Sequence, residues 1–178
     1  SVLWRTQQRA ELHVPDANAF NALSCWRATP PCASQFRARL AWLSGKQGLA
    51  LPGVGPGTWE KLVQARQIDS LLDWLDLSTE QLSAIPGLGP RSASNLQQSF
   101  ALARQRPLHD WLRALGIPAD EALPRDANWE QLAQRSAADW QRYSGVGPQR
   151  AAQLQAFFQH PEVQALREQL RTAQIAGF

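Results

Sequence analysis

The sequence predicts an all-α protein built from repeated pairs of helices joined by tight glycine turns. Three observations support this prediction. Similar segments begin at Leu51, Ile85 and Tyr143, and each places Gly, an apolar residue and Gly just before a helix-compatible run. Apolar residues recur at helical spacing around these segments. The chain has 178 residues, is 44% hydrophobic and contains eight tryptophans, which is enough for a buried core.

Irregular structure is expected before the first helix. Apolar and polar residues alternate over residues 1–14, which is typical of a strand or extended segment, but the chain offers no partner strand. Pro15 and the pair Pro30 and Pro31 interrupt regular structure. We therefore expect residues 15–33 to form a linker and an irregular knot.

The first helix should begin at Ser34. Phe36, Leu40 and Leu43 fall at helical spacing in this segment, and Gly45 can end the helix. This helix leads into the first glycine turn.

Capping residues mark the helices that lead into the other two turns. Ser78, followed three residues later by Gln81, forms a capping-box pattern, and Ser136 is the expected N-cap before the third turn. Four tryptophans lie on apolar helical stripes, so we expect them in the core rather than stacked on bases: Trp42, Trp74, Trp111 and Trp140.

A decayed copy of the turn lies between the second and third complete copies. Its Leu-Gly-Ile-Pro segment keeps Gly116 but has no second glycine. Asp120 and Glu121 stand where the next helix would face an anion, and their carboxylates would repel phosphate. We expect this copy to be scaffold that pairs with the third turn by packing.

The three complete turns are suited to hold phosphate groups. The first turn of a helix leaves N–H groups without partners at the positive end of the helix dipole, and glycine lets a ligand approach the backbone. Proline at the first helical position cannot donate. The turns open with Gly53, Gly87 and Gly145, and the expected donors are the amides of Gly55, Gly57, Thr58, Gly89, Arg91, Ser92, Gly147, Gln149 and Arg150.

Neighbouring side chains support this interpretation. The apolar residues between the glycines, Val54, Leu88 and Val146, should point inward and hold each turn in shape. Lys61, one turn into its helix, could reach a flanking phosphate or lie on a solvated face. Because phosphates carry no sequence information, the pattern predicts sequence-independent binding of duplex DNA.

Charge and composition allow this function without requiring it. The net charge is +3, and Lys46 and Lys61 are the only lysines among 18 basic residues. Arginine suits bidentate phosphate contact, although an arginine-rich composition can also reflect genome base content. No apolar run approaches the roughly 20 residues of a membrane span, so we expect a cytoplasmic protein with no membrane partner. The absence of methionine, even at position 1, suggests a piece of a larger protein.

Cysteine occurs only at Cys25 and Cys32. Two thiols are too few for a tetrahedral zinc site unless other ligands join them, so bound zinc is not expected. No other cofactor is expected in this chain.

The repeats resemble helix-hairpin-helix motifs, and their order resembles the bacterial NAD-dependent DNA ligases. In that family, four such motifs follow a zinc-finger region, which follows an oligonucleotide-binding barrel. The VLWR segment from Val2 resembles the closing strand of the barrel, Cys32-Ala33-Ser34-Gln35 the last zinc-finger cysteine segment, and WLRALGI from Trp111 the degenerate third motif. The fourth motif and the final HPEVQALREQL segment complete the match.

The resemblance implies a domain organisation. Residues 1–20 would be the end of the barrel and a linker, residues 21–48 a reduced zinc-finger region with its leading helix, and residues 49–178 a tandem of four motifs, one of them degenerate. The family zinc finger carries four cysteines, and a further terminal domain follows the motifs. This chain has only two cysteines and stops at Phe178 without such a domain, and both departures match a shorter paralogue of the family.

The resemblance also implies a parent enzyme that is adenylated by NAD, passes AMP to a 5′-phosphate at a nick and joins it to the 3′-hydroxyl. The family nucleophile is a lysine in a Lys-x-Asp-Gly setting, which neither Lys46 nor Lys61 has. We therefore expect no catalytic residue here, only a clamp on duplex DNA that is nicked, working with the adenylation and oligonucleotide-binding domains of the parent chain.

Other interpretations remain open. A glycosylase of the helix-hairpin-helix type would place a nucleophilic lysine directly after a hairpin, where this chain has Pro-Gly, Pro-Arg and Pro-Gln. A protein-docking module would bind a partner through exposed apolar surface. The chain could also be the DNA-binding part of another DNA repair protein.

Overall fold

The computed structural model describes residues 24–178, and the regular structure within this range is helical. The predicted all-α fold is confirmed; an isolated antiparallel bridge joins Arg27 to Ser70. The elements are the 3₁₀ helices η2 (Pro30–Cys32), η3 (Asp73–Asp76) and η4 (Asp120–Ala122), and the α-helices α1 (Ala33–Ser44), α2 (Pro56–Gln64), α3 (Thr79–Ser83), α4 (Pro90–Ala103), α5 (Leu108–Ala114), α6 (Trp129–Ala133), α7 (Ala137–Trp140), α8 (Pro148–Gln159) and α9 (Pro161–Thr172).

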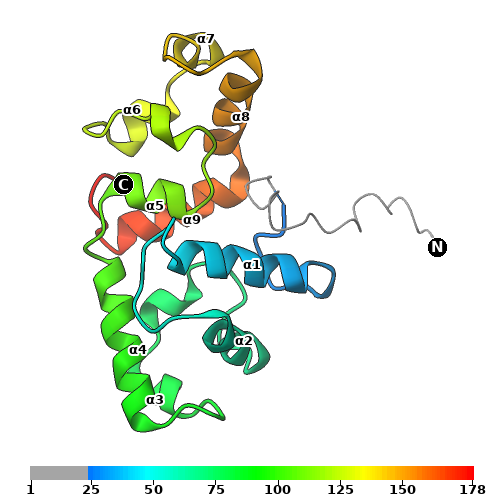
Figure 1. Ribbon diagram of the computed structural model, residues 1–178, viewed down its shortest axis with the longest axis vertical. Coiled ribbons are helices and arrows are strands. Elements are labelled where there is room, and N and C mark those ends of the chain that lie inside the picture. Colours follow the sequence, from blue (N-terminus) through cyan, green and yellow to red (C-terminus); the bar gives the residue numbers. More distant parts are fainter. Residues whose placement is uncertain (1–23) are drawn as a thin grey trace, which may run out of the picture.

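The helices form an elongated molecule with two ends. Helices α2, α3 and α4 lie at one end, α6, α7 and the start of α8 lie at the other, and α1, α5 and α9 lie between them (Figure 1). Across residues 24–178, no helix has the length and apolar character needed to cross a bilayer.

Local sequence accounts for where the helices begin. The predicted capping box of α3 is confirmed, because the Ser78 hydroxyl accepts from the Gln81 amide while the Gln81 side chain accepts from the Ser78 amide. Ser136 caps α7 as expected, with Asp139 as its reciprocal partner. Asn128 caps α6 in the same way, which was not predicted. The helix expected from Ser34 begins one residue earlier and is followed by Gly45.

An aromatic cluster forms the core of the first end. Trp59 stacks on Phe100, and Trp74 stacks on Trp111 with ring centroids 6.2 Å apart. Each buried indole N–H of this cluster finds an acceptor. Trp59 donates to the Ser44 hydroxyl, and Trp74 and Trp111 donate to main-chain carbonyls. These bonds remove the free-energy penalty of burying an indole N–H and fix the orientation of each ring.

A second aromatic cluster forms the core of the other end. Trp140 stacks on Phe158, which also meets Trp129 and Phe157 edge to face. The predicted core positions of Trp74, Trp111 and Trp140 are confirmed, since none of the three is exposed. Trp42 is different because it is only half-buried, and its N–H donates to the carbonyl of Arg113 in α5.

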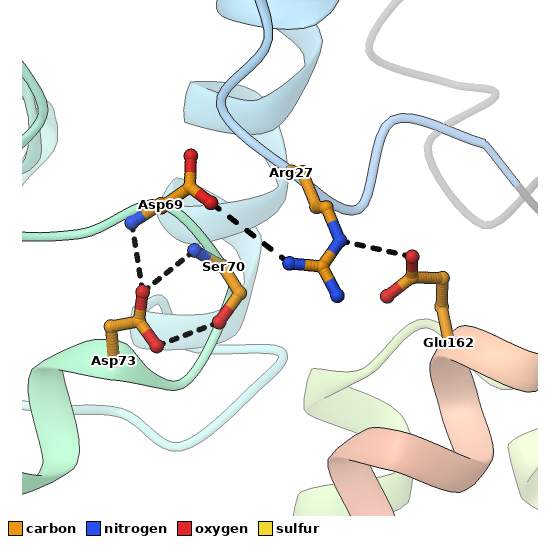
Figure 2. Close-up of polar contacts among 5 residues, drawn as sticks. All are labelled: Arg27, Asp69, Ser70, Asp73 and Glu162. Atoms are coloured by element: carbon orange, nitrogen blue, oxygen red, sulfur yellow. Dashed lines mark hydrogen bonds and ion pairs between the residues drawn. The ribbon is translucent and has the colours of Figure 1, made fainter.

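Polar contacts through Arg27 join the loop before η3 to helix α9 (Figure 2). Its guanidinium donates to Glu162 of α9 at 3.0 Å and lies 3.9 Å from Asp69, in the loop before η3. Asp73 accepts from the amides of Asp69 and Ser70 and from the Ser70 hydroxyl. Burial alone would raise the pKa of Asp73, but these hydrogen bonds outweigh burial and lower it. The Asp73 carboxylate therefore stays ionised and holds in place the loop that Arg27 contacts.

The predicted zinc-finger-like knot is wrong in its chemistry. Cys25 and Cys32 form a disulfide, with Cα atoms 5.2 Å apart, so neither sulfur is available as a thiolate ligand. The closed loop places Trp26 in the core, beneath the guanidinium of Arg39. The extended segment predicted for residues 1–14 lies outside the described residues, and the division of the chain at residues 20 and 48 stays a prediction.

We predict that Ser78→Ala lowers the free energy of unfolding by about 1 kcal/mol, because the Gln81 amide loses its acceptor at the start of α3. Chemical denaturation measures this change. Ser144→Ala is the matched control, since Ser144 is exposed and caps no helix. Equal stabilities for the two variants would contradict the role assigned to the cap.

Candidate nucleic-acid interface

Each of the three predicted glycine turns leads directly into a helix. Gly53, Gly87 and Gly145 have φ angles of +73°, +91° and +83°, in the left-handed region that side chains rarely adopt. After one apolar residue, the second glycine becomes the N-cap and proline the first residue of α2, α4 and α8. We call these segments hairpin 1 (residues 51–58), hairpin 2 (residues 85–92) and hairpin 3 (residues 143–150).

The second glycine of each hairpin is not required by its own backbone. Gly55, Gly89 and Gly147 have φ angles of −125°, −84° and −87°, which any residue can adopt. A Cβ atom built on any of them would meet nothing within 4 Å. Neither strain nor packing explains glycine at these positions. What glycine does provide is a flat main-chain surface that another molecule can approach closely.

Most of the predicted donor amides point to no acceptor within the described chain. Backbone hydrogen bonds are absent at eight of the nine expected amides, namely those of Gly55, Gly57, Gly89, Arg91, Ser92, Gly147, Gln149 and Arg150. Thr58 differs from the expectation, because its amide donates to the carbonyl of Gly55 at 3.1 Å. A tight first turn of α2 produces this bond, which glycine spacing alone does not reveal. The helix starts therefore keep donors for an outside acceptor.

The apolar residue in the middle of each hairpin points inward as predicted. Val54, Leu88 and Val146 are all buried. The amides of Leu88 and Val146 also donate to carbonyls three residues earlier, at Ile85 and Tyr143. Each loop is therefore held in shape before any ligand arrives.

Hairpins 1 and 2 share one hollow of about 280 Å³. Gly53 and Thr58 line it from hairpin 1, while Gly87 and Ser92 line it from hairpin 2. Lys61 bridges the two, with its Nζ 3.4 Å from the carbonyl oxygen of Gly87. The structure thus places Lys61 in contact with both hairpins, although the sequence alone suggested only a phosphate flanking hairpin 1.

Asn95 also lines this hollow and was missed by the sequence analysis. It lies three residues after Ser92 in α4, so both side chains share one face of the helix. The spacing of three residues from Ser92 could have identified Asn95 from the sequence. Its amide can donate to an anion in the hollow beside Lys61.

Hairpin 3 lies at the opposite end of the molecule from hairpins 1 and 2, where α7 leads into α8 (Figure 1). Arg150 bonds to Glu121 of the degenerate copy at 2.9 Å and lies 3.4 Å from the carbonyl oxygen of Gly145. The degenerate copy is therefore beside hairpin 3, as predicted. The Glu121 main chain and Arg150 hold the pKa of the Glu121 carboxyl below its usual value, so this carboxylate stays charged next to the hairpin.

The charges around the two sites differ. Lys61 lines the shared hollow and Arg91 lies in the first turn of α4, and neither has an ion pair within the described residues. Arg150 at hairpin 3 is partly neutralised by Glu121. Within residues 24–178, no group of three or more His, Cys, Asp or Glu side chains is placed to hold a metal ion.

Comparisons with known proteins agree with the geometry of the hairpins. A model of the SAM-like helix-hairpin-helix tandem matches residues 49–101, which contain hairpins 1 and 2. DNA ligase B of Pseudomonas putida (strain W619) is 50% identical over 177 residues, which are 99% of this chain and 31% of that protein. DNA ligase B of Pseudomonas fluorescens (strain Pf0-1) is 54% identical over 178 residues, which are 100% of this chain and 32% of that protein.

The chain is similar to DNA ligases throughout its length. The family resemblance predicted from the hairpins is therefore confirmed, as is the helix-hairpin-helix architecture. The chain spans about a third of the length of these DNA ligases.

We predict that alanine destabilises the protein at one glycine of hairpin 2 and not at the other. Gly87→Ala should lower the free energy of unfolding by about 1–2 kcal/mol, because its φ of +91° is strained for a side chain. Gly89→Ala should leave stability unchanged, since its backbone is ordinary and its surroundings are open. Chemical denaturation of both variants tests this. A large loss at Gly89 would show that this glycine serves the fold.

Proposed function

We propose that this chain binds duplex DNA without sequence preference, through main-chain amides that grip phosphates at the three hairpins. The observation that carries the proposal is the second glycine of each hairpin. Gly55, Gly89 and Gly147 have ordinary backbones and open surroundings. Free amides at the same helix starts provide donors, and the helix dipole favours an anion there.

The charges of the site support DNA as the ligand. Lys61 lines the hollow shared by hairpins 1 and 2, Arg91 lies in the first turn of α4, and Arg150 lies in the first turn of α8. Contacts to phosphate position a protein on the duplex but do not read its bases. Two sites at opposite ends of one molecule would hold the duplex at separate points along its backbone.

We further propose that the chain is the DNA-clamping part of a cytoplasmic ligase that uses NAD to seal nicks. Its similarity to two proteins named DNA ligase B supports this role. The nucleophile and the NAD site would lie in the adenylation domain of the longer protein, and an oligonucleotide-binding domain would complete the ring around the duplex. This chain would contribute DNA binding and no catalytic residue.

A protein-docking module is the second function we considered. Such a module needs exposed apolar surface. In the described residues Leu102 is the only large hydrophobic side chain that is exposed, at 38%. This single residue gives no specific support to docking, so we retain DNA binding, in a ligase or another DNA repair protein.

We predict that Gly89→Val weakens binding to a nicked duplex by about tenfold or more, because the added side chain blocks a phosphate from charged-acceptor hydrogen bonds worth about 1.5–3 kcal/mol. The loss should be the same for duplexes of different sequence. Fluorescence anisotropy measures it over a range of salt concentrations. For the unchanged chain, the logarithm of the affinity should fall by about 0.9 per log unit of salt for each phosphate contacted.

Ala101→Val is the matched control, because it adds similar bulk at an exposed position near the other end of α4. This variant should bind like the unchanged chain. Intact affinity in Gly89→Val would refute phosphate binding at hairpin 2. A response to salt that stays flat would instead favour the docking module.

We predict that Glu121→Gln leaves DNA affinity equal or raises it by up to about threefold, because the change removes a negative charge 2.9 Å from Arg150. Asp126→Asn is the control, since it makes the same chemical change at an exposed aspartate without an ion pair. A clear loss of affinity in Glu121→Gln alone would show that the degenerate copy itself contacts DNA.

A further inference from the structure

A second hollow lies beside hairpin 3, outside the predicted binding residues. Its volume is about 430 Å³, and it is formed where α6 and α7 end. Arg135 and Arg142 line it together with Gln131, Gln134, Asp139 and Tyr143. Because Tyr143 is also the first residue of hairpin 3, the hollow and the hairpin form one continuous surface. We call it the Arg135 hollow.

Arg135 is held in place by aromatic rings. Its guanidinium carbon lies 5.4 Å from the ring centroid of Trp140 and 5.1 Å from that of Tyr143, distances that allow cation–π attraction to both. Trp140 is fully buried, so one wall of this support is rigid. The guanidinium is therefore oriented before a ligand arrives, which reduces the entropy lost on binding.

The oriented guanidinium has no acceptor in residues 24–178. It forms no ion pair within 4.0 Å, and its Nε is buried without a hydrogen-bond partner. The charge of Arg135 is therefore uncompensated by a close carboxylate, and a ligand with acceptor oxygens in the polar hollow would supply the missing partner.

The one carboxylate in the hollow is already engaged. Asp139 accepts from the Ser136 amide at 3.0 Å and lies 3.9 Å from Arg142. Hydrogen bonds from the Ser136 amide and hydroxyl lower the pKa of Asp139, so it remains a fixed anion of the capping box. Arg142 and Arg135 both act electrostatically on Asp139, so this one carboxylate faces two guanidinium groups and a net positive charge is left for an incoming anion.

We propose that the Arg135 hollow is an additional contact for the DNA backbone, in which Arg135 binds a phosphate next to the one held by hairpin 3. Arg142 and the amide groups of Gln131 and Gln134 supply further donors around it. This proposal rests on the proposed function of the hairpins and extends it. It also compensates for the weakened charge at hairpin 3, where Glu121 pairs with Arg150.

The test is Arg135→Gln in the 178-residue chain, measured by anisotropy with a nicked duplex over a range of salt concentrations. Loss of one phosphate contact should weaken binding about tenfold at moderate salt and make the salt slope shallower by about 0.9. Arg135→Lys keeps the charge but loses the planar stack, so its DNA affinity should lie between those of the unchanged chain and Arg135→Gln. Arg66→Gln is the control, because it removes an exposed arginine at the far end of α2 from hairpin 1 and should leave the slope unchanged.

Arg142→Gln keeps the test decisive if loss of the stacked Arg135 disturbs the fold. The Arg142 side chain is 81% exposed, so the fold should tolerate its removal, while a bound phosphate would lose a donor and the salt slope would become shallower. Affinity and slope unchanged in Arg135→Gln, or in Arg142→Gln where the first variant does not fold, would overturn the proposal. If Gly89→Val weakens binding and these variants do not, only the Arg135 hollow is refuted. If Gly89→Val also has no effect, the proposed function fails as well.

Discussion

Main-chain N–H groups at helix starts are the constraint on which the rest of this structure depends. Every helix leaves such donors, and a buried helix start must satisfy them internally. At α2, α4 and α8 the chain instead keeps them at the surface, with glycine in front and a buried apolar residue behind. The surrounding helices serve to hold these exposed donors in a fixed geometry.

Two aromatic clusters and a small set of polar contacts provide that geometry. Large rings pack together at each end, and both sets belong to one continuous hydrophobic core. Directional polar contacts are added to this core, as in the hydrogen bond from Trp42 to α5 and the ion pairs of Arg27. Directional contacts of this kind set orientation more than they add stability.

Features encoded locally could be predicted from the sequence. The capping box at Ser78 and the burial of the Val54 side chain follow from a few neighbouring residues, and the structure has both. The bridge from Lys61 to hairpin 2 could not be predicted, because it depends on how two repeats pack. The same is true of the disulfide and of Arg135, whose aromatic support comes from residues that only the fold brings together.

The loop closed by Cys25 and Cys32 has a mechanical consequence. Its Trp26 ring contacts the His160 ring, and the next residue, Arg27, forms ion pairs with both Asp69 and Glu162. These contacts hold the loop before η3 against α9, and so contribute to the spacing between hairpins 1 and 2 at one end of the molecule and hairpin 3 at the other (Figure 1). Under the proposed function, a duplex whose bend does not match this spacing would meet the hairpins at one end but not at the other, so the protein would select DNA by its shape rather than by its sequence.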